Sequence, residues 1–185
     1  MGIGEPLLNM NNITYAYHYV KQETNFNRYK ISIATMVPKN KLTQLNNFAI
    51  LNSKEHCKVH YSIHSMFNRE NLIPLGHNSE EVIKLMRQIN KDYNTELELH
   101  YNLINKINDS IEEIKVLADQ NIPVSFIRLS DTDELFQTPQ SHVDILENML
   151  KKEYPHLDFE CYTPPGADIR ASCGQFSTEI YGNRG

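Results

Sequence analysis

Strand-like and helix-like segments alternate along the whole of this 185-residue chain. In the helix-like segments hydrophobic residues recur at three- and four-residue spacing, and in the strand-like segments they alternate with polar residues. Such an alternation predicts βαβ units around a mostly parallel sheet, and therefore an α/β fold. The strand-like segments are 29–37, 58–64, 97–103, 122–129 and 157–161, and the helix-like segments are 11–24, 41–50, 79–93, one that starts at 109, and 138–152.

The helix with the strongest pattern is predicted at 79–93. Val82, Met86 and Ile89 recur there at helical spacing, which is typical of a helix that buries one face. Asn78 with Glu81 predicts the N-terminal cap of this helix. A second helix start is predicted at Thr138-Pro139, because threonine caps helices and proline suits the first turn.

The strand predicted at 58–64 has two different faces. Val59, Tyr61 and Ile63 alternate with His60, Ser62 and His64. We expect the first three to face a core and the second three to face the opposite side. A zinc site on the histidine face is chemically possible, but the sequence offers no obvious third ligand, and no metal site is predicted.

Length and composition favour one domain that covers residues 1–185. Hydrophobic residues make up 40% of the chain, which predicts a folded core rather than disorder. No apolar run approaches the roughly 18 residues that a membrane span requires, and the N-terminus does not have the pattern of a secretory signal. Five strands are too few for a closed eight-stranded barrel, so an open sheet or part of a larger barrel is expected.

The cysteine count and the net charge bear on the cellular location and on nucleic-acid binding. Cys57, Cys161 and Cys173 are too few and too scattered for a disulfide framework, which favours a reducing, cytoplasmic location. The net charge is −5 and the 18 basic residues are dispersed. Charge therefore gives no support to nucleic-acid binding.

The two ends of the chain carry the most specific motifs. Asp168 to Gln175 sets Cys173 among small residues, and Gly2 to Asn9 contains Gly4-Glu5-Pro6. In this order, both resemble segments of the RlmN/Cfr family of radical S-adenosylmethionine (SAM) RNA methyltransferases. The resemblance extends along nearly the whole chain, because Asn108-Asp109-Ser110 is similar to a Val-Asn-Asp strand end of that family.

The resemblance implies where SAM would bind and which cysteine would react. The implied SAM-binding residues, at or near the ends of strands, are Gly4, Glu5, Ser32, Ser62, Ile63, His64 and Ser130. Ser130 stands where the family usually has asparagine. Cys173 matches the family's catalytic cysteine, which carries a methyl group on its sulfur before that carbon is added to an adenine ring of rRNA or tRNA.

The implied fold is an incomplete (β/α)6 barrel, a partial TIM barrel of the radical SAM type, with about five mostly parallel strands and helices outside. In this family a [4Fe–4S] cluster on a Cys-x-x-x-Cys-x-x-Cys loop splits SAM to a radical. No such triplet occurs in this sequence, although the cluster needs closely spaced thiolates. We therefore expect the C-terminal portion of such an enzyme, inactive alone, with RNA as the implied substrate and a separate N-terminal half as a candidate partner.

Two other hypotheses remain open at the level of sequence. The chain could be a non-catalytic remnant that binds SAM or a protein partner, or it could belong to a radical SAM enzyme with a non-RNA substrate, which would suit the acidic charge. A hydrolase built on a cysteine and a histidine is disfavoured, because no nucleophile elbow surrounds Cys173. Arg170 and Pro165 depart from the family motif and weaken the assignment of RNA.

Overall fold

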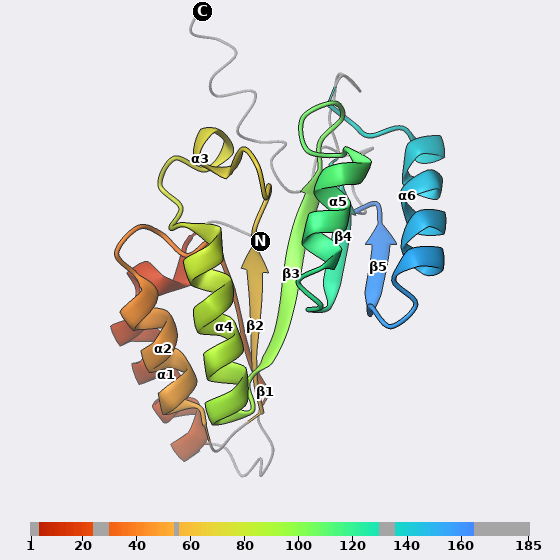
Figure 1. The fold of residues 1–185 in the computed structure, drawn as a ribbon. Helices are drawn as coiled ribbons and strands as arrows, with labels where there is room; N and C mark the ends of the chain where they lie inside the picture. Colours follow the sequence, from red (N-terminus) through yellow and green to blue (C-terminus); the bar gives the residue numbers. More distant parts are fainter. Residues whose placement is uncertain (1–3, 24–29, 54–55, 130–135, 165–185) are drawn as a thin grey trace, which may run out of the picture. The chain divides into compact units, whose positions relative to one another are not determined.

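A computed structural model describes residues 4–23, 30–53, 56–129 and 136–164 (Figure 1). The described elements, in chain order, are η1 (Pro6–Leu8), α1 (Met10–Glu23), β1 (Lys30–Thr35), α2 (Leu42–Leu51), β2 (His56–Ser62), α3 (Arg69–Leu72), α4 (Ser79–Tyr93), β3 (Glu96–Leu103), α5 (Ile111–Ala118), β4 (Val124–Arg128), α6 (Gln140–Glu153) and β5 (Phe159–Tyr162).

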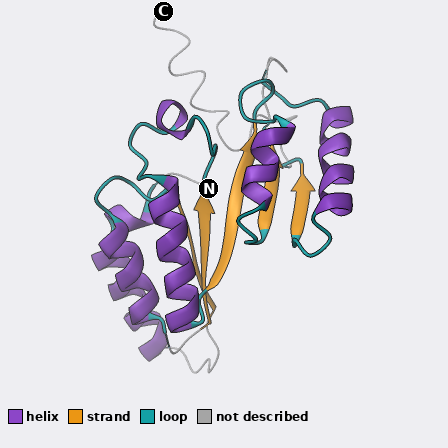
Figure 2. Cartoon of the chain, viewed as in Figure 1, coloured by secondary structure: helices purple, strands orange, loops and turns teal. Residues whose placement is uncertain are grey.

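The strands form one sheet in the order β1-β2-β3-β4-β5 (Figure 2). β1 pairs with β2 in parallel, and β4 pairs with β5 in parallel. Successive strands are joined by helical segments, as parallel neighbours require. The α/β class and the alternation predicted from the sequence are confirmed.

The chain divides into two compact units. The N-terminal unit is Ile3–Ile63 with Arg69–Leu99, and the C-terminal unit is Met1–Gly2 and His64–Asn68 with His100–Gly185. The division falls inside β3, so each unit contains part of the sheet. The expectation of a single domain over 1–185 stays a prediction.

The core of the N-terminal unit lies where α2 and α4 pack together beside β1 and β2 (Figure 1). The fully buried side chains come from one stripe of each element: Leu45, Phe48 and Ala49 of α2, Val82, Met86 and Ile89 of α4, and Val59 and Tyr61 of β2. The face of β2 predicted to be apolar is thus the buried one. Burying a side chain of this size stabilises the fold by about 1.5–3 kcal/mol.

The ends of α4 agree with the sequence pattern. The Oδ1 atom of Asn78 accepts hydrogen bonds from the backbone N–H groups of Glu80 at 3.0 Å and Glu81 at 3.2 Å. These bonds satisfy two N–H groups that the helix itself cannot pair. At the other end Asn94 is left-handed with φ 54°, a conformation that asparagine tolerates better than most residues.

The C-terminal unit is built around a row of aromatic rings on three strands. Tyr101 of β3 meets Phe126 of β4 edge-on, with ring centroids 5.9 Å apart. Phe126 in turn meets Phe159 of β5 at 6.3 Å, also edge-on. This arrangement is the favourable one for aromatic pairs. α5 and α6 lie beside this part of the sheet (Figure 1).

Two details of the sequence prediction are wrong. Thr138 does not cap α6, because its hydroxyl donates to the carboxylate of Asp109 at 2.9 Å and Pro139 occupies the cap position without a side-chain bond. The helical spacing of Ile111, Ile114 and Leu117 predicts that all three face the core, but Ile111 is 37% exposed. In the part of the chain that the structure describes, no helix combines the length and apolar character needed to span a membrane.

Candidate functional site

The structure describes six of the eight residues that the sequence assigns to the site. Gly4, Glu5, Ser32, Ser62 and Ile63 belong to the N-terminal unit, and His64 belongs to the C-terminal unit. Ser130 and Cys173 lie outside the described residues, as does the whole motif around Cys173. The site can therefore be built only from the ends of β1 and β2 and the segment that contains Glu5.

Glu5 binds the end of β1 through its carboxylate. Its Oε1 atom accepts from the hydroxyl of Thr35 at 2.5 Å and from the N–H of Leu7 at 3.0 Å, and its Oε2 atom accepts from the N–H of Met36 at 3.1 Å. Thr35, itself fully buried, in turn accepts from the N–H of Val37 at 2.9 Å. A carboxylate can accept about four hydrogen bonds, so Oε2 retains capacity for one further donor.

Gly4 precedes this carboxylate in a conformation that requires glycine. Its φ is +125°, and a Cβ built on it would meet nothing within 4 Å. Backbone conformation, not lack of space, therefore demands glycine here. The result is that the chain can turn sharply into Glu5 and the short helix η1, whose first turn contains Pro6.

Ser32 and Ser62 occupy different heights on the sheet. Ser32 pairs in register with Lys58, whereas Thr35 pairs with Tyr61, the residue before Ser62. Ser32 is thus about 13 Å below the level of Ser62 at the usual rise per strand residue. Ser62 ends β2 and lies near the level of Thr35 at the end of β1, where Glu5 has its partners, whereas Ser32 does not.

The ends of β1 and β2 share a buried arginine that sequence reasoning did not single out. The guanidinium of Arg69, which is only 5% exposed, donates to the carbonyl oxygen of Met36 and to those of Ser62 and Ile63. Its ring partner is Tyr61, whose centroid lies 5.0 Å from the guanidinium carbon. Burial raises the pKa of Tyr61 to about 12, so this ring stays neutral.

His64, in the C-terminal unit, has its backbone fixed by Asn108. The residue is left-handed with φ 62°, and its carbonyl oxygen accepts from Nδ2 of Asn108 at 2.5 Å. Asn108 is fully buried; it also donates to the carbonyl of Asn102 at 2.7 Å and accepts from the N–H of Ile104 at 2.7 Å. The motif at Asn108 therefore organises a loop through its amide group.

The two described cysteines are unsuited to ligating a cluster. Cys57 is 1% exposed, and burial raises the pKa of its thiol to about 12. Burial likewise raises the pKa of Cys161 to about 12, with the neighbouring Glu147 adding to the effect. Metal ligation requires thiolates, and the spacing of the cysteines in the sequence also excludes a shared loop. These residues do not fit a [4Fe–4S] cluster.

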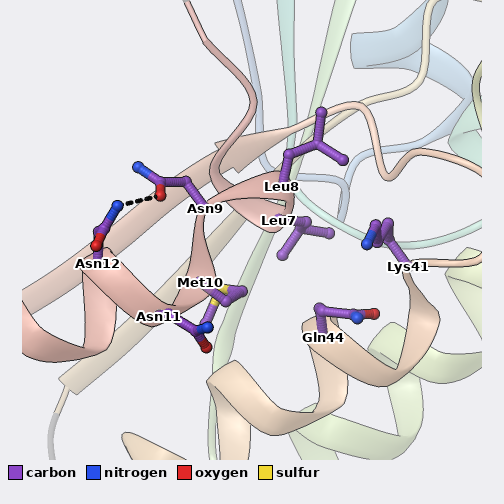
Figure 3. Close-up of a pocket in the computed structure, with 8 residues that line it drawn as sticks. All are labelled: Leu7, Leu8, Asn9, Met10, Asn11, Asn12, Lys41 and Gln44. Atoms are coloured by element: carbon purple, nitrogen blue, oxygen red, sulfur yellow. Dashed lines mark hydrogen bonds between the residues drawn. The ribbon is translucent and has the colours of Figure 1, made fainter.

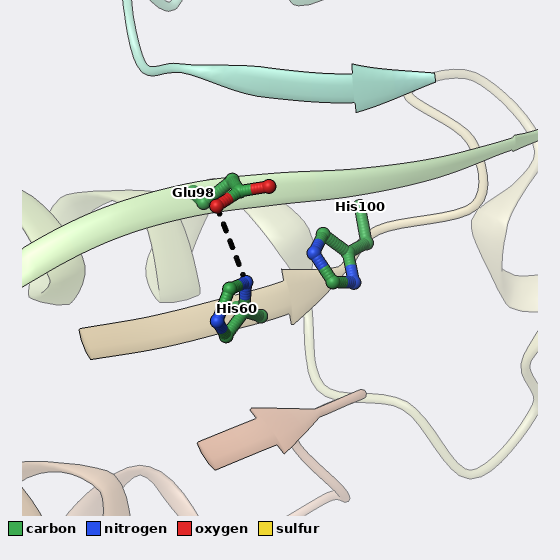
Figure 4. A group of neighbouring side chains, drawn as sticks. All are labelled: His60, Glu98 and His100. Atoms are coloured by element: carbon green, nitrogen blue, oxygen red, sulfur yellow. Dashed lines mark ion pairs between the residues drawn. The ribbon is translucent and has the colours of Figure 1, made fainter. Parts of the chain in front are cut away.

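A polar pair on the opposite face of β2 and β3 was not anticipated. Nδ1 of His60 lies 3.3 Å from Oε2 of Glu98 (Figure 4). His100 follows Glu98 by two residues along β3, but it belongs to the C-terminal unit. The ammonium of Lys58 contacts the same oxygen of Glu98. The Glu98 carboxylate is therefore already paired with a cation, the ammonium of Lys58. That the chain has no metal site stays a prediction.

A cavity of about 340 Å³ lies in the N-terminal unit, next to the segment that contains Glu5 (Figure 3). Leu7, Leu8, Asn9, Met10, Asn11, Asn12, Lys41 and Gln44 line it. The residues come from η1, the start of α1 and the start of α2. None of them was predicted as a site residue, because a cavity between two helix starts has no motif of its own.

The fold matches those of solved radical SAM proteins. A radical SAM methyltransferase from Sphaerobacter thermophilus superposes with a TM-score of 0.78 at 23% identity, over 95% of this chain and 53% of that one. A domain of pyruvate-formate lyase-activating enzyme from Bacteroides vulgatus gives a TM-score of 0.62 at 14% identity, over 86% of this chain and 95% of that domain. The incomplete (β/α)6 barrel of the radical SAM type is therefore the fold of this chain.

The sequence comparison is more specific. The chain is 28% identical over 185 residues to a Thermotoga petrophila protein named "Probable dual-specificity RNA methyltransferase RlmN", covering 95% of this chain and 52% of that protein. The chain thus resembles the C-terminal portion of an RlmN-type enzyme, and it spans about half the length of the curated relatives it matches. No family model matches the chain.

Proposed function

We propose that this chain is the C-terminal, SAM-binding part of a radical SAM methyltransferase whose cluster ligands lie outside it. The observation that carries this proposal is the Glu5 carboxylate at the end of β1. Its three hydrogen bonds with Leu7, Thr35 and Met36 fix its orientation. The remaining capacity of Oε2 suits an ammonium group, and SAM carries one beside its sulfonium centre.

The other described residues would contribute shape and orientation at the same strand ends. Ser62 would supply a hydroxyl at the end of β2, and Ile63, whose side chain is fully buried, would contribute through its backbone. His64 follows Ile63 directly and is left-handed, and the resemblance implies a SAM contact for it. SAM, when bound, supplies the methyl group and the radical precursor, whereas the protein positions it and excludes water.

The finer assignments rest on the resemblance. In the intact enzyme Cys173 would carry the methyl group, and an adenine of RNA would receive it. The enzyme would also need a [4Fe–4S] cluster, which another segment or chain would supply. A cytoplasmic location suits both the substrate and the free thiols.

Calorimetry tests this proposal with SAM as the titrant. We expect the purified chain to bind SAM, and Glu5→Gln to weaken binding roughly 10- to 150-fold, because a charge-assisted bond of about 1.5–3 kcal/mol is lost. Glu70→Gln is the matched control, since Glu70 is exposed and should leave the affinity unchanged. A chain that does not bind SAM, or equal weakening by both variants, would contradict the proposal.

A second function, SAM binding without turnover, is favoured by the cysteine spacing, because this sequence contains no Cys-x-x-x-Cys-x-x-Cys triplet. Reconstitution of the isolated chain with iron and sulfide tests both roles, because neither of them provides cluster ligands within this chain. The proposal expects no stoichiometric cluster in the chain alone. Formation of a cluster that cleaves SAM would mean that the chain is a complete catalyst.

A further inference from the structure

We infer that Arg69 is the positioning residue of the proposed SAM site, because it imposes the backbone turns at the ends of β1 and β2. As a statement about SAM, this inference rests on the proposed function. As a statement about the backbone, it rests only on contacts within the N-terminal unit.

Each hydrogen bond that the Arg69 guanidinium donates to a described residue goes to a backbone carbonyl oxygen. Nη2 donates to Met36 at 2.5 Å, and Nη1 donates to Ser62 at 3.1 Å and to Ile63 at 2.5 Å. Nε donates to His77 at 3.3 Å. One planar group thus connects the ends of two parallel strands with the loop before α4. A lysine could not do this, because an ammonium lacks the fixed fork of five N–H donors.

Two of these carbonyls belong to the peptide groups that lead into left-handed residues. The Met36 carbonyl lies in the peptide that joins it to Val37, which has φ 52°, and the Ile63 carbonyl lies in the peptide that joins it to His64, which has φ 62°. Left-handed backbone is unfavourable for both residue types, and most of all for β-branched valine. Such conformations persist only where surrounding contacts fix them, and they cluster at ligand sites.

The turn at Val37 is held from more than one side. Its N–H donates to the hydroxyl of Thr35 at 2.9 Å, and its carbonyl accepts from the N–H of His77 at 2.7 Å. His77 is also a carbonyl partner of Arg69. One hydrogen-bonded network, the strand-end network, therefore joins Arg69, the loop that contains His77 and the end of β1. It continues to Glu5 through Thr35 and Met36.

Gly76 provides the room for this guanidinium. A Cβ added at Gly76 would lie 2.8 Å from Nη2 of Arg69 and 2.8 Å from Cγ2 of Ile73. Because Nη2 donates to Met36, an alanine at this position would push the guanidinium without removing any donor. Gly76→Ala therefore perturbs the positioning of the strand ends independently of the arginine itself.

The experiment compares Arg69→Lys and Gly76→Ala with Ile89→Ala, a core variant in α4 of the same unit. Ile89 is fully buried in α4 and is not one of the hydrogen-bonded residues of the strand-end network. SAM affinity and thermal stability are measured for each. We expect the first two to weaken SAM binding about tenfold or more at temperatures where all variants are folded, and the core variant to lower stability with less than about a twofold change in affinity. Equal changes in affinity at equal loss of stability would overturn the inference.

Hydrogen exchange provides the readout that does not depend on SAM. We expect the amides of Val37 and His77 to exchange faster in Arg69→Lys and Gly76→Ala, relative to amides inside α4. Wild-type protection at both amides in these variants would overturn the inference. If the wild-type chain does not bind SAM, the proposed function fails, while the exchange data still decide whether Arg69 sets the backbone.

Discussion

The hydroxyl of Ser65 donates to the carboxylate of Glu113 at 2.5 Å, and so ties the segment after β2 to the first turn of α5. The same carboxylate oxygen accepts from the N–H of Met66 at 2.7 Å. Glu113 is 3% exposed, so its two contacts lie in a low-dielectric environment where unpaired donors are costly. Glu113 has the same role in the C-terminal unit as Glu5 has in the N-terminal unit. In each unit one glutamate carboxylate accepts a hydrogen bond from a backbone N–H group just after a strand.

Replacing Glu113 should destabilise the protein. Glu113→Gln removes the charge, so the bonds that Ser65 and Met66 donate to this side chain lose their charge assistance. We expect a loss of about 1.5–3 kcal/mol in the free energy of unfolding, the range for hydrogen bonds to charged groups. Urea denaturation measures it. Glu112→Gln, at the neighbouring exposed position, should have almost no effect; a comparable loss there would indicate that charge on α5, and not the Ser65 contact, matters.

The substitution Asn108→Asp should strongly destabilise the folded chain. In Asn108→Asp a carboxylate oxygen would face the carbonyls of His64 and Asn102, where the native amide donates two hydrogen bonds. We expect a loss of about 3 kcal/mol or more, because a charge would be buried without a donor. Asn108→Ala, which only removes the bonds, should cost less. A stability for the aspartate variant equal to or above that of the alanine variant would contradict this geometry.

The stability of the protein should fall at alkaline pH partly through Cys57. Burial raises the pKa of its thiol from 9.0 to about 12 in the folded chain. Between these values the unfolded chain has released the proton while the folded chain retains it, so stability decreases as pH rises. Cys57→Ala should therefore make the fall between pH 9 and 12 shallower in urea titrations. Val59→Ala, on the same buried face, should keep the wild-type slope; a shallower slope in both would refute the role of the thiol.

The cap of α4 should contribute about 1 kcal/mol. Asn78→Ala removes the acceptor for the N–H groups of Glu80 and Glu81. Chemical denaturation should report this loss without a change in the slope against denaturant. Lys84→Ala, in the exposed middle of the same helix, serves as the control and should change stability by less than about 0.5 kcal/mol. Equal effects would mean that the cap is not formed in solution.

Local patterns of the sequence predicted the elements well. α4 begins and ends as its hydrophobic spacing and Asn78 indicated, because both signals act within a few residues. The failure at Thr138 has the opposite cause: Asp109, which lies 29 residues away in the sequence, competes for its hydroxyl. Contacts at that separation leave no mark on the local sequence.

The lack of a local sequence signal also explains why the sequence did not predict Arg69 or the contact of His60 with Glu98. Arg69 binds four carbonyl groups, and every residue has a carbonyl, so no residue type identifies its partners. Its helix α3 has only four residues, too few to show periodicity. The contact of His60 with Glu98 depends on how β2 and β3 align, which strand patterns alone do not specify.

The central claim, that the ends of β1 and β2 together with Glu5 form a SAM pocket, is tested most directly by titrating SAM into the isotopically labelled chain and mapping amide chemical shifts. The account predicts that saturable shifts concentrate at Gly4, Glu5, Met36, Ser62 and Ile63, and that Glu5→Gln reduces them. Shifts confined to other parts of the chain, or none at millimolar SAM, would contradict it.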